Sequence, residues 1–302
     1  MADLRFIDLP DLVVISDDQT LLAASLPPHS PGNSRSLKIE TLSNYILNLV
    51  PTLPDYPKYY SEGFYLNYST ASVVEIKPGA MRSDDNTFNL NSSASLFPNL
   101  AVSGVNGLDS GLEAASTWYA VHVIADSNNV NPIAGLFSLS STTPILPAGY
   151  DKFGFRGWVR NNSSSNIWQF IDQSSGRKVK HRYFNVGRDQ TQVLANGLAT
   201  TFTTVSAASF VPPGCTSAEI FVGFDNQTTA NHAYAFRVNS ETAIVDTQHI
   251  SYTQFAGSAA VIYTRENINL NSSREFQYRV YDNGSGTPSA VQVSVRGFEY
   301  SI

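Results

Sequence analysis

The sequence has few residues that could cross-link the chain or give it a strong charge. Its 302 residues include a single cysteine, Cys215, so no disulfide can form within the chain. We therefore expect stability to come from burial or from subunit association. Charged residues make up only 15%, with 19 basic against 25 acidic, for a net charge of −6. This balance argues against nucleic-acid binding, which needs clustered Lys and Arg to displace counterions from phosphates.

Long hydrophobic runs and compact catalytic motifs are also missing. No segment approaches the roughly 18 apolar residues of a membrane span, and the start MADLRFIDLPDLVV lacks the basic cap and apolar run of a signal peptide. The five histidines show neither H-x-H nor H-E-x-x-H spacing, and no G-x-S-x-G elbow is present. We expect synthesis in a cytoplasm, no membrane insertion, no metal, no cofactor and no catalytic residues, and hence no enzyme.

What the chain does contain is typical of an all-β protein. Hydrophobic residues make up 42% and aromatic residues 12%, enough to fill real cores. Short apolar runs alternate with Gly, Asn and Pro turns, which predicts tandem antiparallel β-sandwich domains of jelly-roll-like form. Residues 118–125 form the strongest predicted strand, and residues 60–68 are also predicted to form a strand. In the last strand the apolar parity changes at Arg296-Gly297, and a β-bulge explains this change.

The spacing of these patterns divides the chain into three parts. We expect an N-terminal segment and proline-rich linker over residues 1–58, a first β-sandwich over 59–177 and a second over 178–302. The N-terminal segment should carry one short helix, since apolar residues recur at helical spacing over 42–49 before the prolines end it.

The region from Gly104 to Trp158 has a characteristic order of motifs. It contains the GVNGLDSG turn region, the TWY that opens the predicted strand, and the proline-punctuated FSLSSTTPILPAGY of residues 137–150. This succession resembles a module of tail-fibre and other structural proteins of tailed bacteriophages. The resemblance implies a virion protein, assembled as a homotrimer, most naturally a tail-associated fibre or tip protein that contributes to attachment to the host surface.

The N-terminal pattern DLP…VISDDQTLLAAS…SLKIETLSNYI resembles the first segment of many phage fibre proteins. That resemblance implies docking to another virion protein, and an ordinary minor subdomain is the alternative. The apolar residues expected to dock are Phe6, Leu12, Val14, Leu42, Tyr45 and Ile46.

Two other sets of residues are candidates for contacts. The one dense basic run supplies Arg177, Lys178, Lys180 and Arg182, which would contact an anion or an acidic partner, or else form a solvated connection with Val179 and Tyr183 facing inward. Tyr252 and Phe255 would stack on a host cell-surface glycan if they emerge at loop tips. The acidic group at residues 84–86 is interpreted as turn chemistry rather than as a calcium site.

The sequence leaves the biological role open between two virion locations and one enzymatic class. A capsid-associated fibre or decoration protein would use the same β domains to ornament the shell. A host-glycan hydrolase or esterase is the alternative of another class, because phage fibres and spikes face polysaccharides and hydrolysis needs two carboxyl groups flanking the bond.

Overall fold

The computed structural model describes residues 12–15, 21–24, 35–36, 56–226, 232–238, 248–252, 260–282 and 290–302. The protein is all-β, built from several antiparallel sheets, as the sequence predicts. The chain divides into two compact units, Met1–Asp55 and Tyr56–Ile302.

The first unit contains a small antiparallel sheet in the order β1-β2-β3. Its strands are β1 (Leu12–Ile15), β2 (Leu21–Ala24) and β3 (Arg35–Ser36). The helix predicted over residues 42–49 lies outside the described residues.

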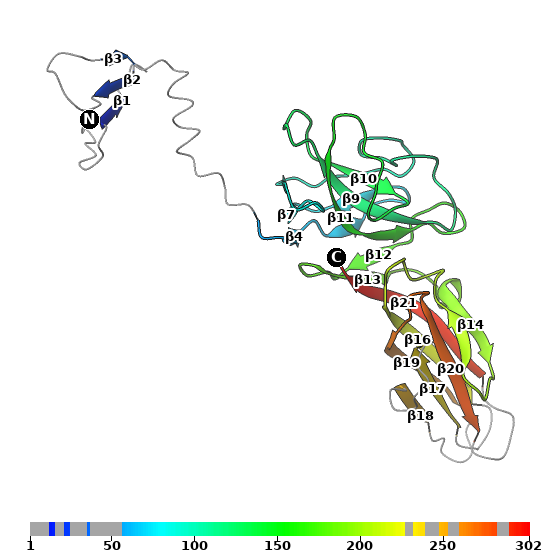
Figure 1. Cartoon of the computed structure of the whole chain (residues 1–302). Coiled ribbons are helices and arrows are strands. Elements are labelled where there is room, and N and C mark those ends of the chain that lie inside the picture. The colour runs from blue at the N-terminus through cyan, green and yellow to red at the C-terminus, as the bar shows by residue number, and fades with distance from the viewer. Residues whose placement is uncertain are drawn as a thin grey trace. The chain divides into compact units, whose positions relative to one another are not determined.

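In the second unit, residues 56–177, here called the first half, form small sheets around one large core and one smaller hydrophobic cluster. Figure 1 shows β9, β10 and β11 side by side; they form a sheet in the order β10-β9-β11. In one smaller sheet β7 pairs with β4 and with β8, and in another β5 pairs with β6. The buried side chains of Val121, Val123 and Phe137 belong to this core. The strands are β4 (Ser61–Gly63), β5 (Leu66–Tyr68), β6 (Val74–Ile76), β7 (Gly79–Arg82), β8 (Asn89–Ser92), β9 (Trp118–Ala125), β10 (Ala134–Ser138) and β11 (Lys152–Arg160).

Residues 178–302, the second half, form a two-sheet sandwich together with β12, which lies in the first half. One sheet runs β12-β13-β21-β16-β19, with β14 also paired to β21, and the other runs β15-β20-β17-β18. Alternating residues such as Phe236, Phe276 and Val293 fill the core of this half. The elements are β12 (Phe170–Asp172), β13 (Lys178–Tyr183), the 3-10 helix η1 (Arg188–Thr191), β14 (Gln192–Gly197), β15 (Thr203–Ser206), β16 (Ser217–Asn226), β17 (His232–Val238), β18 (Gln248–Tyr252), β19 (Ala260–Asn269), β20 (Glu275–Asp282) and β21 (Ala290–Ser301).

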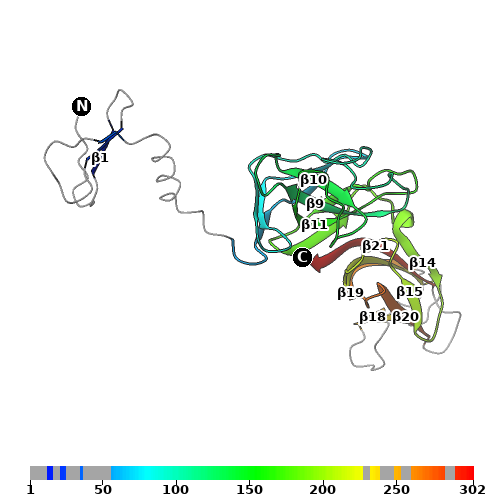
Figure 2. The same cartoon turned by 45° about the horizontal axis from the view of Figure 1, so that its top comes forward.

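The short strand β12 connects the two halves. Phe170 packs in the core of the first half, while β12 pairs with β13 in the sheet of the second half. Figure 1 shows β12 and β13 between the two groups of strands, and Figure 2 shows β21 passing beneath β11 to the C-terminus. Strand pairing therefore crosses residue 177, where the sequence predicts a domain boundary, and the division there stays a prediction.

The bulge predicted in the last strand is present. Glu219 faces Gly297 and the next residue, Ile220, faces Val295, so Arg296 is the extra residue in β21. Gly297 is required there because a Cβ would lie 2.4 Å from the carbonyl oxygen of His181. The bulge moves Phe298 onto the buried face despite the change of parity.

One predicted strand is wrong. The sequence predicts a continuous strand over residues 60–68, but the chain forms β4 and β5 in different sheets. Gly63, which ends β4, and the next residue, Phe64, have φ of 73° and 51°, a left-handed conformation that turns the backbone. Burial of Phe64, which is fully inaccessible to solvent, offsets the strain of its positive φ.

Candidate functional site

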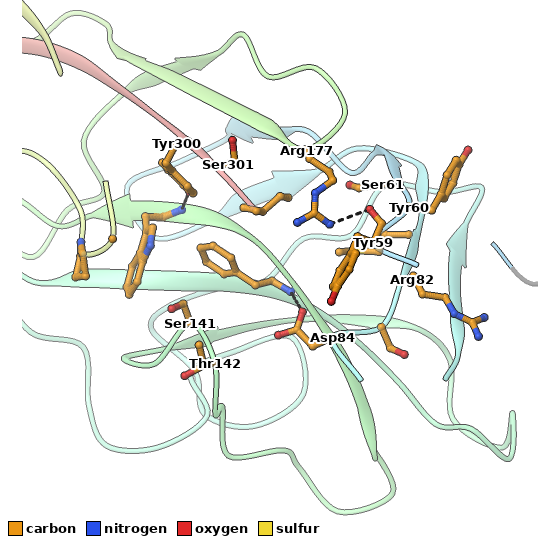
Figure 3. A pocket seen from close by; sticks show the side chains of 17 residues that line it. Tyr59, Tyr60, Ser61, Arg82, Asp84, Ser141, Thr142, Arg177, Tyr300 and Ser301 are labelled. Carbon is orange, nitrogen blue, oxygen red and sulfur yellow. Dashed lines mark hydrogen bonds between the residues drawn. The ribbon is translucent and has the colours of Figure 1, made fainter. Parts of the chain in front are cut away.

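A pocket of about 360 Å³ lies within the second unit and takes its walls from both halves. Figure 3 shows the lining side chains converging from several segments. Most of them are aromatic, hydroxyl-bearing or charged: Tyr59, Tyr60, Ser61, Met81, Arg82, Ser83, Asp84, Ser141, Thr142, Phe155, Trp158, Arg177, Pro213, Gly214, Tyr300, Ser301 and Ile302.

Tyr59 is fixed at the pocket by its backbone. Its N–H donates to Asn86 Oδ1 at 2.8 Å, and its carbonyl oxygen accepts from Arg177 Nη1 at 3.0 Å. These bonds hold Tyr59 at φ 62°, which a bulky residue rarely adopts. The Arg177 guanidinium also lies 4.8 Å from the Tyr59 ring centroid, a cation–π distance. The side chain is still 60% exposed, so the ring is accessible.

Asp84 enters the pocket from the turn that follows β7. Asn86 N–H donates to the Ser83 carbonyl at 2.8 Å, which closes the turn, and Asp84 N–H donates to the Phe153 carbonyl at 2.9 Å. The turn interpretation of residues 84–86 thus agrees with the structure. Partial burial raises the pKa of Asp84, aided by Asp85, while the Phe155 N–H and Arg177 act in the opposite direction.

The floor of the pocket joins β11 to β21. Trp158 N–H donates to the Tyr300 hydroxyl at 3.1 Å, and the Phe155 ring lies roughly parallel to that of Tyr300 with centroids 6.3 Å apart. Burial holds the pKa of Tyr300 well above its usual range, so its hydroxyl stays neutral. These contacts fix the second half against the first at this position.

A buried polar cluster lies at the same junction. Arg156, 1% exposed, donates from Nε to the Phe64 carbonyl at 2.9 Å. Asp172 accepts from Leu66 N–H at 2.7 Å and lies 3.6 Å from His181 Nε2. Burial would raise the pKa of Asp172, but the nearby His181 imidazole, together with the Ser174 hydroxyl and the Leu66 N–H, lowers it to about 2. The cluster stabilises the junction beside the pocket.

The pocket has the features of a binding site. Its charged side chains, Asp84, Arg177 and Arg82, lie among aromatic rings and hydroxyl groups. The Arg82 guanidinium donates to the Asn86 carbonyl at 3.0 Å and to Asn89 Oδ1. Within the described parts of the chain, no three His, Cys, Asp or Glu residues are grouped to hold a metal ion. A helix able to cross a membrane is likewise not found among the described residues.

The predicted basic run is divided by the strand that it forms. Arg177 lines the pocket, whereas Lys178 and Arg182 lie on the outer face of β13 and pair with acidic residues of the same chain. Lys178 Nζ lies 2.6 Å from Glu299 Oε1, and Arg182 Nη2 lies 2.9 Å from Glu219 Oε1. Lys180 shares that face and is half-buried. Val179 and Tyr183 are buried, as the alternative interpretation expects.

The other predicted site residues are not brought together. Tyr252 ends β18, and Phe255 lies outside the described residues, so glycan contact there stays a prediction. Leu12 and Val14 lie in β1. The remaining residues predicted to dock, Phe6, Leu42, Tyr45 and Ile46, lie outside the described residues.

Sequence reasoning named Arg177 as a contact residue but missed the other residues that define the pocket. Tyr59 follows the proline-rich stretch and carries no periodic signal, and Asp84 reads as an ordinary turn residue. The one feature of the sequence that could have indicated this site is the pair of adjacent acidic residues at 84 and 85. This pair does not indicate which residues lie opposite it in the fold. The pocket depends on contacts between segments far apart in the chain.

Comparisons with known proteins do not assign the chain to a family. No family model matches it, and no curated protein matches its sequence. Among solved structures it is similar to the VP2 subviral particle of infectious bursal disease virus, at 12% identity over 87% of this chain and 81% of that chain, with a TM-score of 0.22. A structure of the Gx strain of the same virus gives 10% identity over 96% of this chain and 67% of that chain, with a TM-score of 0.20. Similarity this low carries no argument about fold or function.

Proposed function

We propose that this protein is a structural component of a bacteriophage virion, most specifically a trimeric tail-associated fibre or tip protein that contributes to host-surface attachment. The observation that carries the proposal is the motif order of residues 104–158, which resembles a module of phage structural proteins. In the structure this segment supplies β9, β10 and β11, one continuous antiparallel sheet. The all-β architecture agrees with such a role.

The proposed division of labour follows the two compact units. Residues 1–55 would dock to another virion protein, and residues 56–302 would project and meet the host surface. Several copies on one particle turn weak individual contacts into durable adhesion. The proposal therefore requires incorporation into particles and several copies of the chain, and does not require high affinity at any single site.

Labelling of intact particles tests the virion assignment. An antibody against this chain should decorate purified particles at the tail, and particles that lack the chain altogether would contradict the proposal. Decoration of the shell would instead support the capsid-associated alternative. Release of soluble sugar from purified host polysaccharide by the isolated protein would favour the hydrolase alternative.

A deletion tests the docking role. Removal of residues 1–55 should leave a soluble β protein that no longer enters particles, because the second unit contains both large cores. Incorporation of the shortened protein at the level of the full chain would contradict docking through this segment. Sedimentation of the full chain as a monomer would contradict trimer formation.

A further inference from the structure

The pocket described above combines an accessible aromatic ring with a strained backbone. Tyr59 keeps φ 62° although its ring is 60% exposed and gains little from burial. A bulky residue in this conformation is strained, and such strain concentrates at binding and active sites. Arg177 lies over the ring, and the exposed part of the ring is available to a flat apolar surface.

Two of the three charged side chains of the pocket, Asp84 and Arg177, have hydrogen-bonding capacity to spare. Among the described residues, Asp84 accepts one long bond, from Phe155 N–H at 3.5 Å. Arg177 donates to the Tyr59 carbonyl and forms no ion pair with any described residue. A carboxylate accepts up to about four hydrogen bonds and a guanidinium donates five, so both groups can bond to a ligand.

We propose that this pocket binds a neutral sugar unit of a polysaccharide, with the ring of the sugar against Tyr59 and its hydroxyls between Asp84 and Arg177. This inference rests on the proposed role in host attachment and names the class of ligand. The volume of about 360 Å³ lies in the range of roughly 300–1,000 Å³ that holds small ligands. The hydroxyls of Ser141 and Thr142, which also line the pocket, supply further polar contacts.

The balance of charge selects a neutral ligand. A strongly anionic sugar would meet Asp84, and a cationic ligand would meet Arg177. The third charged side chain of the lining, Arg82, already donates to the Asn86 carbonyl and to Asn89 Oδ1. The side chains of the described lining include one carboxylate, whereas glycoside hydrolysis uses a pair. We therefore assign binding rather than cleavage to the pocket.

Ligand-observed NMR with the full-length protein tests the assignment. The probes are methyl glucoside, methyl galactoside and N-acetylglucosamine at millimolar concentration, with glucuronic acid as the charged comparison. At least one neutral probe should bind more tightly than glucuronic acid. Tyr59→Asn, which removes the ring but suits a positive φ, and Asp84→Asn should each weaken binding about tenfold, the effect of losing a stacking or a charge-assisted contact.

Two exposed residues outside the pocket lining supply matched controls. Phe184→Ala removes an aromatic side chain that is 48% exposed, and Asp189→Asn removes a carboxylate that is 87% exposed. Both should bind the sugar like the unaltered protein. Circular dichroism and thermal melting of all four variants should match the unaltered chain, so that lost binding reports the site.

The inference is overturned if no neutral probe binds, if glucuronic acid binds best, or if the Tyr59 and Asp84 variants bind as well as the controls. Labelling of particles is scored separately. If particles are labelled but the protein binds no sugar, the sugar-binding inference fails and the virion assignment stands. If the protein binds sugar but is absent from particles, the virion assignment fails and the sugar-binding inference stands.

Discussion

Acid should destabilise this protein through one buried histidine, His122. It is fully buried in β9, with Nε2 2.8 Å from the Ser140 carbonyl and its ring between those of Phe153 and Phe155. Burial lowers the pKa of His122 from 6.5 to about 4, against the opposing effects of the Ser140 carbonyl and the charge of Asp109. The folded protein therefore keeps this ring neutral at a pH where the unfolded chain protonates it.

The magnitude comes from the difference in proton affinity. At about 1.4 kcal/mol per pKa unit, the lowered pKa of His122 corresponds to about 3 kcal/mol of unfolding free energy. This contribution is present in full above the pKa of the unfolded chain and is lost as pH falls toward about 4. Between about pH 7 and about pH 5 the loss is about 2 kcal/mol. Urea denaturation across this pH range should show this loss of unfolding free energy, together with any contribution from the other histidines.

Two variants isolate the contribution of this side chain. His122→Gln retains a donor for the Ser140 carbonyl, and His122→Phe retains an aromatic ring; neither titrates. Whatever their stability at neutral pH, both should lose about 2 kcal/mol less than the unaltered protein between about pH 7 and about pH 5. Equal pH dependence in all three proteins would refute the reasoning.

The remaining predictions concern the junction, the bulge and the basic strand. Asp172→Asn should cost about 2 kcal/mol of unfolding free energy at neutral pH, because the lowered pKa of Asp172 stabilises the fold only while the carboxylate is ionised. The variant should also lack the part of the acid destabilisation that sets in between about pH 4 and about pH 2. An unchanged urea midpoint would contradict this prediction. Gly297→Ala should cost about 1–3 kcal/mol in the same assay, since its Cβ would lie 2.4 Å from a backbone oxygen, whereas Gly187→Ala, which meets only a side chain at 3.3 Å, should be nearly neutral. Replacing Lys178 and Arg182 by Gln should change stability by no more than about 1 kcal/mol per ion pair, because both pairs are partly exposed; a larger loss would show that the pairs hold β13 in place.

Local patterns in the sequence determined the all-β class and several elements of it. The alternation of side chains along a strand has a period of two residues, so the strand at residues 118–125 and the inward side chains of residues 179 and 183 could be read directly. The same rule located the bulge, because an extra residue such as Arg296 must reverse the parity of the residues after it.

Only the tertiary structure decided where the strand predicted at residues 60–68 is interrupted and which residues form the pocket. The break depends on the burial of Phe64, which offsets its positive φ, and burial is a property of the assembled core. The pocket joins Asp84 to Phe155, 71 residues away, and Trp158 to Tyr300, 142 residues away. Periodicity describes neighbours along one strand, and it carries no information about which distant segments meet.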